Sequence, residues 1–375
     1  MKITEVKTFL VETGRQNWLF VKVITDEGLY GWGEASVEGQ NKATEQCIHK
    51  LAGRSVIGED PRRIEYIWQK MYRHGFWKGG FIHMSAISGI DIALWDLAGK
   101  IYNVPTYMLL GGAVRDKIKT YSHAFTAEMA KEVIDMGFAG VKTGAGAVRG
   151  VYDPRPDTKA LAKRLEEVRK IIGDEPLIMI DNHGKSSPIE AIKKMKAAQP
   201  FDIHFFEEAI PPENSRAFKQ IRAACPDMTI ATGERLFGRF DYREIVQEGV
   251  IDIAQPDVSH CGGITEIKKV ASFIEPYHIK FAPHNPNGPV SSAANLHVCA
   301  TVQGFDILEF ASQSIYSRSD IITTKLNLKP KDGYFELPLG PGLGIDFDEK
   351  AFEKYPFSNK QYDPQFWPDG AVAEI

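Results

Sequence analysis

The sequence predicts an α/β fold in which a closed (β/α)8 barrel, or a close variant without a clear last helix, follows a smaller α+β domain. Strands precede helices in residues 1–115, and this segregation is typical of an α+β domain. Short β-rich runs then alternate with helical patterns over residues 116–340, which indicates crossover units and a parallel sheet. Eight such units over this length fit a barrel.

The N-terminal domain begins with strands. Residues 3–12 alternate in polarity, and two further strands are expected within residues 19–35. Apolar residues at helical spacing follow over residues 64–72 and 87–97. Strands followed by segregated helices favour an α+β domain.

The barrel strands are expected at regular intervals along the chain. They are residues 118–123, 139–143, 177–183, 203–210, 229–234, 251–257, 278–284 and 305–311. Apolar stripes between them, such as Ile264, Ile267 and Val270, indicate helices. A doubly wound open sheet is the alternative, but no GxGxxG motif follows a predicted strand.

The last segment, residues 341–375, is rich in proline, glycine and aromatic residues and is too apolar for a free linker. We expect it to pack back on the N-terminal domain. The aromatic residues expected to make this contact are Phe352, Tyr355, Phe357, Phe366 and Trp367.

Composition and charge disfavour several classes of protein. The 45 Lys and Arg residues and 49 Asp and Glu residues leave a net charge of −4, so no basic field exists to hold a nucleic acid. No apolar run reaches the roughly 18 residues of a membrane span, and the N-terminus does not resemble a signal peptide. The 4 cysteines form no CxxC pair, which favours a reducing compartment. We expect a cytoplasmic protein that binds neither nucleic acid nor a membrane.

Ionisable residues recur at the ends of the predicted strands. From the third strand onward they are Asp181, Glu207, Glu234, Asp257, His284 and Glu309. The gaps between them are 26, 27, 23, 27 and 25 residues, about one strand–helix unit each. Active-site groups of barrel enzymes lie at the C-terminal ends of the strands. This spacing therefore predicts that the six side chains meet in one pocket.

Three carboxylates on successive strands, Asp181, Glu207 and Glu234, indicate a metal site. Converging carboxylates repel one another unless a cation lies among them. A set of oxygen ligands without a thiolate favours Mg²⁺ over zinc. Helix capping or solvent exposure is the alternative for any one of the three.

Two histidines are candidates for proton transfer. His183 follows Asp181 by two residues, so strand periodicity places both on one side. His284 ends the seventh predicted strand, and Asp257, one strand earlier, can accept its hydrogen bond and fix its tautomer. A lone histidine in either place can also be structural.

Glu309 and Lys142 are further candidates. Glu309 lies in an apolar run, where a carboxyl is costly unless it is paired or protonated. A protonated Glu309 could donate a hydrogen bond to an oxyanion, and a strand salt bridge is the alternative. Lys142 ends the second predicted strand, where a substrate contact and a surface position are equally open.

Several motifs carry a resemblance to a known family. In the N-terminal domain they are Gly31-Trp32-Gly33-Glu34 and Met84-Ser85-Ala86-Ile87-Ser88-Gly89-Ile90-Asp91; in the barrel they are Asp181-x-His183-Gly184, Glu207-Glu208, Gly233-Glu234-Arg235, Gln255-Pro256-Asp257-x-Ser259-His260 and Ala282-Pro283-His284. With these the chain resembles the mandelate racemase subgroup of the enolase superfamily, and within it the galactonate dehydratase type of sugar-acid dehydratases. The resemblance covers nearly the whole chain.

The resemblance implies a modified TIM barrel, (β/α)7β, with an N-terminal α+β capping domain. It implies a lyase that binds Mg²⁺ through Asp181, Glu207 and Glu234 and dehydrates an aldonate such as galactonate to a 2-keto-3-deoxy acid through an enediolate. The cation's charge would stabilise that intermediate. The family is usually multimeric, so a homo-oligomer is expected by analogy.

The resemblance also implies the acid and base roles. His284, backed by Asp257, would remove the C2 proton, and His183 would protonate the departing C3 hydroxyl. Glu309 would hydrogen-bond the enediolate, and a substrate contact of Lys142 stays open. A base and an acid of the same residue type must start in different protonation states, with His284 neutral and His183 protonated. The rate is therefore expected to follow a bell-shaped dependence on pH.

One departure bears on the reaction. Racemases of the family carry Lys-x-Lys on the second barrel strand, whereas Lys142 is followed here by Thr143 and Gly144. A racemase or epimerase is therefore a weaker hypothesis. A cycloisomerase of an anhydro- or lactone-type sugar acid and a non-catalytic sugar-acid binding protein also stay open, and so does the identity of the substrate.

Overall fold

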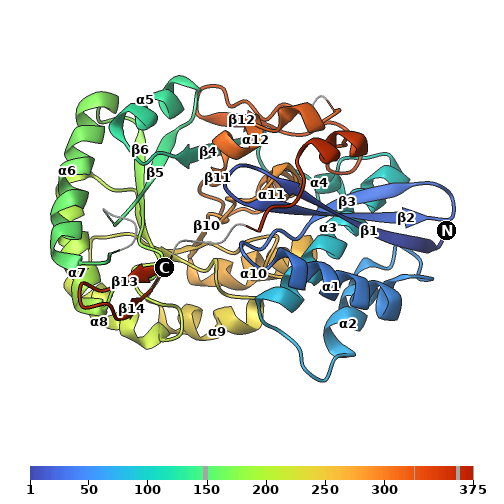
Figure 1. Ribbon diagram of the computed structural model, residues 1–375, viewed down its shortest axis with the longest axis horizontal. Helices are drawn as coiled ribbons and strands as arrows, with labels where there is room; N and C mark the ends of the chain where they lie inside the picture. Colours follow the sequence, from blue (N-terminus) through green and yellow to red (C-terminus); the bar gives the residue numbers. More distant parts are fainter. Residues whose placement is uncertain (147–150, 325, 360–363, 375) are drawn as a thin grey trace.

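An antiparallel sheet opens the chain in the computed structural model, which describes residues 1–146, 151–324, 326–359 and 364–374. Its strands are β1 (Ile3–Glu12), β2 (Asn17–Thr25) and β3 (Tyr30–Glu34), paired in that order (Figure 1). The helices that follow are α1 (Asn41–Leu51), α2 (Ile64–Arg73), α3 (Phe81–Tyr102) and α4 (Thr106–Leu109), with a π-helical turn over Ala52–Val56. These elements form the cap.

Helix α3 packs closely on the sheet because β3 carries glycines at the contact. A Cβ atom on Gly33 would lie 1.8 Å from the backbone oxygen of Gly89, and one on Gly31 would lie 2.0 Å from that of Ala93. Glycine is therefore required for this approach. By length and composition α3 could cross a membrane, but 78% of its apolar window is buried inside the protein. It serves as a core helix of the cap.

Eight parallel strands follow in the described residues and confirm the predicted barrel. They are β4 (Lys117–His123), β5 (Gly140–Gly144), β6 (Leu177–Asp181), β7 (Phe205–Glu207), β8 (Ile230–Thr232), β9 (Ile253–Ala254), β10 (Lys280–Phe281) and β11 (Leu308–Phe310). The helices between them are α5 (Ala127–Asp135), α6 (Pro154–Ile172), α7 (Pro188–Ala198), α8 (Phe218–Ala224), α9 (Arg239–Glu248), α10 (Gly263–Ile274) and α11 (Pro289–Ala300). After β11, α12 (Ser312–Tyr316) is a short helix, so the barrel is of the (β/α)7β type.

The sheet closes on itself. Its order runs from β10 through β4 to β11, and the backbone amide of Phe281 donates to the oxygen of Gly304 at 2.9 Å, while the amide of Asp306 donates to the oxygen of Phe281 at 2.9 Å. The strand register also pairs Asp181 directly with Glu207. Their carboxylates therefore leave neighbouring strands at the same height.

The observed strands are shorter than the sequence predicts. β8, β9 and β10 end before Glu234, Asp257 and His284, which lie two or three residues beyond the hydrogen-bonded ladder. At this end the chain leaves the sheet to form the loops that carry side chains into the pocket, which is the usual arrangement in such barrels.

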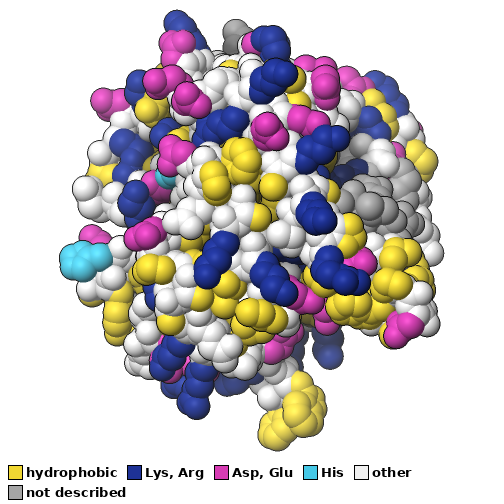
Figure 2. All heavy atoms as spheres, turned by 90° about the vertical axis from the view of Figure 1, so that its left-hand side faces the viewer, with side chains coloured by type: hydrophobic (Ala, Val, Ile, Leu, Met, Phe, Trp, Pro, Cys, Tyr) yellow, Lys and Arg dark blue, Asp and Glu magenta, His cyan; other side chains and the backbone are white. Residues whose placement is uncertain are grey.

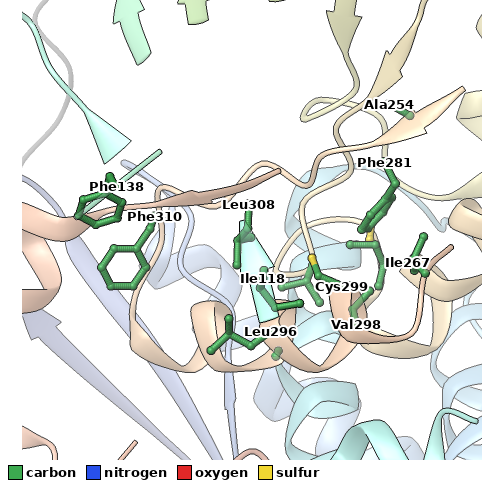
Figure 3. Close-up of a cluster of buried hydrophobic side chains, with 14 of the residues drawn as sticks. Ile118, Phe138, Ala254, Ile267, Phe281, Leu296, Val298, Cys299, Leu308 and Phe310 are labelled. Carbon is green, nitrogen blue, oxygen red and sulfur yellow. The ribbon is translucent and has the colours of Figure 1, made fainter. Parts of the chain in front are cut away.

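Apolar side chains fill two layers of the barrel. Inside it lie Tyr121, Met179, Phe205, Ala231, Ile253, Ala282 and Ile307, all buried. A second cluster lies between the strands and the helices around them, and Figure 3 shows part of it next to α11, with Phe281 and Leu308 from the sheet facing Leu296 and Val298. These layers make the barrel a rigid support for the loops at its mouth.

The C-terminal segment contacts both parts of the chain. Phe347 stacks on Phe20 with 4.9 Å between ring centroids, and Phe352 lies 5.3 Å from Phe9, so this stretch packs on the cap sheet. Phe366 and Trp367 do not: Trp367 packs on Tyr152 of the barrel at 4.9 Å. The expectation that these two residues pack on the first domain is therefore wrong.

The remaining short elements complete the fold. They are β12 (Tyr334–Glu336), β13 (Gln365–Phe366), β14 (Val372–Ala373) and 3-10 turns at Gln199–Phe201, Ser215–Ala217, Glu275–Tyr277, Ser319–Ile321 and Glu349–Lys354. β12 pairs antiparallel with β4, and β13 pairs with β14. On the face shown in Figure 2, basic and acidic side chains are interspersed rather than gathered by sign, in agreement with the small net charge.

Candidate active site

Three carboxylates meet at the mouth of the barrel. Asp181 ends β6, Glu207 ends β7 and Glu234 follows β8, and each offers an oxygen within 4.8 Å of the others. Burial, and then neighbouring carboxylates, raise the pKa of Glu207 and of Glu234 well above the ordinary value. A divalent cation would relieve this repulsion, and an all-oxygen ligand set suits a hard cation. The three residues therefore fit a metal site.

Lys142 lies beside this trio rather than on the surface. Its Nζ lies 2.7 Å from Glu309 Oε1, 3.0 Å from both oxygens of Glu207 and 3.4 Å from Asp181 Oδ2. Burial alone would lower the pKa of Lys142, but Glu207 and Glu309 raise it well above its usual value. Lys142 is thus a fixed cation at the edge of the carboxylates.

A second group, Glu207, His284 and Glu309, also has ligand-to-ligand distances that suit a metal ion. Lys142 already pairs with both carboxylates of this group, and His123 Nε2 contacts Glu309 Oε1. Its charge is therefore balanced by side chains of the protein. The trio with Glu234 is the better cation site.

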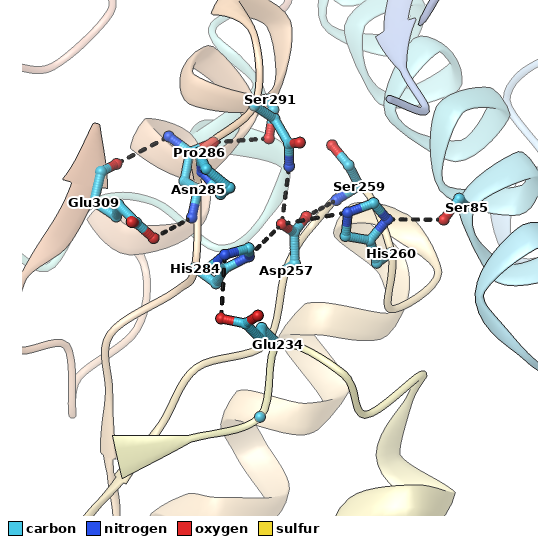
Figure 4. A network of polar contacts seen from close by, with 12 residues as sticks. Ser85, Glu234, Asp257, Ser259, His260, His284, Asn285, Pro286, Ser291 and Glu309 are labelled. Atoms are coloured by element: carbon cyan, nitrogen blue, oxygen red, sulfur yellow. Dashed lines mark hydrogen bonds and ion pairs between the residues drawn. The ribbon is translucent and has the colours of Figure 1, made fainter. Parts of the chain in front are cut away.

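His284 is held by a charged partner on each side of its ring (Figure 4). Its Nδ1 lies 2.8 Å from Asp257 Oδ2, and its Nε2 lies 3.2 Å from Glu234 Oε2. Asp257 also accepts hydrogen bonds from the amide of Ser259 at 2.7 Å and from Asn287 Nδ2 at 2.8 Å. These contacts orient the ring so that Nε2 faces the carboxylates.

The charged neighbours of His284 favour its protonated form, whereas the sequence predicts a neutral base. Burial lowers the pKa of His284, but Glu309 and Asp257 outweigh burial and raise it to about 9. Asp257 follows β9 and Glu309 lies on β11, so their combined effect depends on tertiary structure.

His183 reaches the same pocket, but not through strand alternation. β6 ends at Asp181, and His183 takes a left-handed backbone conformation with φ of 49°. Its amide donates to Asp181 Oδ1 at 2.9 Å, and its Nε2 lies 3.0 Å from Asp181 Oδ2. The side chain is 49% exposed. A turn rather than a strand therefore presents this imidazole.

Glu309 is fully buried and accepts contacts on both oxygens. Its Oε1 faces His123 and Lys142, and its Oε2 accepts a hydrogen bond from the amide of Asn285 at 2.8 Å. Although burial opposes it, Lys142 and His284 hold the pKa of Glu309 well below its usual range. The protonated acid expected from the sequence is therefore replaced by a carboxylate.

The cap completes the pocket, which has a volume of about 470 Å³. From the cap it is lined by Arg15, Val37, Glu38, Gln40 and Phe81. Gln16 Nε2 donates to the backbone oxygen of Pro286 at 3.3 Å, which ties the loop between β1 and β2 to the barrel loop after His284. The cap loop thus lies at the pocket.

Two further histidines lie at the site, and the sequence analysis predicted a functional role for neither of them. His123 ends β4 and contacts Glu309, so its position at the end of the first predicted strand was a usable signal. His260 lies 3.7 Å from Asp257 Oδ2, and its Nδ1 lies 2.8 Å from Ser85 Oγ of α3 (Figure 4). That link joins the cap to the support of His284.

Family models match both parts of the chain. Residues 3–111 match the mandelate racemase / muconate lactonizing enzyme N-terminal domain, and residues 125–351 match the enolase C-terminal domain-like family. The chain belongs to the enolase superfamily. Within it the chain falls in the mandelate racemase subgroup, whose enzymes use a divalent metal.

Full-length relatives agree with this placement. The D-galactonate dehydratase of Ralstonia pickettii (strain 12J) is 38% identical and that of Cronobacter sakazakii (strain ATCC BAA-894) is 37% identical, each matched over 100% of both chains. The structure of an enolase from Agrobacterium radiobacter, bound to Na and L-malate, superimposes with a TM-score of 0.90 at 32% identity over 100% of both chains. These relatives identify this superfamily member as a lyase.

Proposed function

We propose that this enzyme catalyses the Mg²⁺-dependent dehydration of a sugar acid, an aldonate resembling galactonate, to a 2-keto-3-deoxy acid through an enediolate. The arrangement that carries the proposal is the carboxylate trio of Asp181, Glu207 and Glu234 with His183 and His284 in the same cavity. The full-length likeness to D-galactonate dehydratases supports the substrate class.

Asp181, Glu207 and Glu234 would hold the cation, which supplies positive charge to offset the substrate carboxylate and the enediolate. His284 is placed to take the C2 proton on Nε2, because Asp257 holds Nδ1. A cation at Glu207 and Glu234 would also offset negative charge around His284 and favour its neutral, basic form.

The second half of the reaction breaks the C3–O bond. His183 gives a proton to the departing hydroxyl, water leaves, and the resulting enol becomes the 2-keto group. His183 is half exposed in the cavity, as a group that must recover its proton from solvent should be. The proton taken from C2 and the proton given to the C3 oxygen pass through two different imidazoles.

Lys142 and Glu309 act together in this proposal. Glu309, as a carboxylate, accepts rather than donates, so its part is to orient Lys142 at 2.7 Å and to accept a hydrogen bond from a substrate hydroxyl. Lys142 then supplies a fixed positive charge beside the position of the substrate carboxylate.

A panel of hexonates, pentonates and anhydro-sugar acids with Mg²⁺ tests the proposal. We expect 2-keto-3-deoxy acids from an aldonate, and chelation of the metal should stop their formation. Ring opening without loss of water would instead favour a cycloisomerase, and C2 deuterium exchange without product would favour an epimerase. Binding of a sugar acid without turnover across the panel would contradict an enzymatic function.

A further inference from the structure

A lysine lies fully buried behind the active site, outside the machinery described above. Lys194 of α7 has no exposed surface, and its Nζ donates to Asn182 Oδ1 at 2.9 Å. The ring of Tyr152 lies 5.4 Å from the same Nζ. Lysine is among the residues that proteins bury least, so a completely enclosed one invites a functional explanation.

Its acceptor, Asn182, lies between the metal-ligand candidate Asp181 and the acid candidate His183. The side chain of Asn182 is 2% exposed, and its Nδ2 donates to the backbone oxygen of Ala209 at 2.9 Å. Its amide donates to the oxygen of Glu207 at 3.1 Å. Asn182 is therefore anchored to the neighbouring strand and, through Lys194, to helix α7.

The backbone that follows Asn182 is strained. His183 and Gly184 have φ values of 49° and 66°, in the left-handed region that residues with a side chain rarely adopt. Such a conformation persists when its surroundings hold it, and it costs on the order of 1–3 kcal/mol at a residue that is not glycine. The turn over residues 182–184 directs the His183 side chain into the cavity.

We propose that Lys194 is a positioning residue that locks the turn over residues 182–184 and thereby fixes His183 for proton transfer. The catalytic part of this inference rests on the proposed role of His183, whereas the locking of the turn does not. Lys194 touches neither the cavity nor the carboxylate trio, so it acts through Asn182.

Folding alone does not account for a lysine at this position. Burial lowers the pKa of Lys194 to about 8, and Asp157 and Glu190 offset this only in part. An apolar residue of similar length would avoid the desolvation of a charge, although it would leave Asn182 Oδ1 with only the 3.4 Å contact to Ser186. A residue that costs stability while organising a site fits the usual trade-off between stability and activity.

The C-terminal hairpin covers this arrangement from outside. Tyr152, whose ring lies against Lys194, donates its amide to the oxygen of Phe366 at 2.8 Å and packs on Trp367. Its hydroxyl lies 3.4 Å from Ser186 Oγ, which contacts Asn182 Oδ1 at the same distance. Phe366 and Trp367 therefore contact the barrel next to the residues that enclose Lys194.

The Lys194→Met variant tests the proposal, with Lys193→Met as its matched control because Lys193 is exposed on the same helix. For Lys194→Met we expect the kcat for dehydration to fall by about 10–100-fold, as for other residues that support a catalytic group. C2 deuterium exchange, which depends on His284, should fall far less, and the midpoint of denaturant unfolding should decrease only slightly, because the charge desolvation that the variant avoids offsets the lost hydrogen bond to Asn182. A proportional loss of exchange, dehydration and stability would mean a merely structural lysine and would overturn the proposal.

Hydrogen exchange gives a readout that does not require turnover. Amides of residues 183–185 should exchange faster in Lys194→Met than in Lys193→Met or the wild type, and unchanged exchange there would overturn the proposal. If the wild type dehydrates no sugar acid, the proposed function fails while this measurement still decides whether Lys194 locks the turn.

A second variant approaches the same contact from the other side. Asn182→Ala removes the acceptor, and it should reproduce the faster exchange even if Lys194→Met does not fold. In the double variant the loss of kcat should be no greater than in Asn182→Ala alone, because Asn182→Ala already removes the contact with Lys194. Additive losses would show that Lys194 does not act through Asn182.

Discussion

Buried carboxylates occur in two places in this molecule, and their surroundings differ. Where the cap meets the barrel, Glu34 accepts hydrogen bonds from the amides of Gly288 and Ser291 at 2.6 and 3.0 Å. Asp91 of α3 accepts from the amide of Thr265 at 2.9 Å and from its hydroxyl at 2.5 Å. Both carboxylates, called here the interface carboxylates, lie at the N-termini of barrel helices, α11 and α10.

At the mouth of the barrel, Asp181, Glu207 and Glu234 face one another and charged side chains: Lys142 contacts Asp181 and Glu207, and His284 contacts Glu234. Their oxygens are gathered within ligand distance, and Asp181 and Glu234 line the cavity. Burial is common to both groups, so it does not distinguish a functional acid from a structural one. The distinction is whether the donors around a carboxylate already satisfy it or leave it directed at a shared empty volume of the pocket.

The largest effect expected from this contrast is on turnover. Glu234→Gln keeps the shape of the side chain but removes one negative ligand, so Mg²⁺-dependent dehydration should fall to background. Stability should be unchanged or higher, because burial and neighbouring acids raise the pKa of Glu234 and its charge is costly in the folded state. Steady-state rates at several Mg²⁺ concentrations and denaturant unfolding measure both.

The exposed Glu244→Gln on α9 is the control and should leave both quantities unchanged. Retained metal-dependent turnover in Glu234→Gln would show that Glu234 is not a metal ligand. The contrast between the carboxylate trio and the interface carboxylates would then no longer hold for Glu234.

The next largest effect concerns the base. His284→Asn should lower C2 deuterium exchange and dehydration by about 10²–10⁴-fold, the usual contribution of a general base. NMR of recovered substrate in deuterated buffer measures the exchange. His278→Asn is a matched control, because His278 is exposed and asparagine tolerates its φ of 57°. Exchange that persists in His284→Asn would assign the base to another residue.

The spacing of ionisable residues predicted which barrel side chains gather, because parallel strands of a closed sheet share one C-terminal edge. Asp181, Glu207, Glu234 and His284 meet for this reason. Residue spacing along the chain carries no such information for Arg15, which reaches the pocket from the cap through packing of distant segments.

The charge state of Glu309 and the turn at His183 could not be predicted from the sequence, because both depend on residues that are distant along the chain. The protonation of Glu309 depends on Lys142 and His284, which come from other strands. The left-handed turn at His183 depends on anchors in α7 and β7. Strand periodicity predicted the correct side for His183. In the structure, however, a left-handed turn after β6, and not strand alternation, presents this side chain.

The interface carboxylates should respond to mutation in stability. Asp91→Asn leaves one donor of Thr265 facing an amide nitrogen, so the free energy of unfolding should fall by about 1–3 kcal/mol. Burial raises the pKa of Asp91 to about 7, so its contribution is fully present below its unfolded pKa of about 4 and is lost as pH rises through about 7. The loss in Asp91→Asn should therefore be larger at pH 5 than at pH 8.

Denaturant unfolding at the two pH values measures this difference, and the exposed Asp174→Asn should show neither effect. A loss for Asp91→Asn that grows with pH would have the wrong sign and would show that Asp91 is held as an anion in the folded protein.

Histidines sharpen the same contrast on a smaller scale. Carboxylates raise the pKa of His284, whereas His297 of α11 is buried against Tyr107, whose amide donates to its Nδ1 at 3.1 Å. Burial lowers the pKa of His297 to about 4. Because the unfolded chain then binds the proton more readily, the stability that neutral His297 contributes is complete above about pH 6.5 and is lost as pH falls through about 4.

His297→Gln should reduce the acid slope of the unfolding free energy by up to one proton between these values, while exposed His74→Gln leaves it unchanged. An unaltered slope in His297→Gln would mean that this imidazole, like His284, has a charged partner in solution.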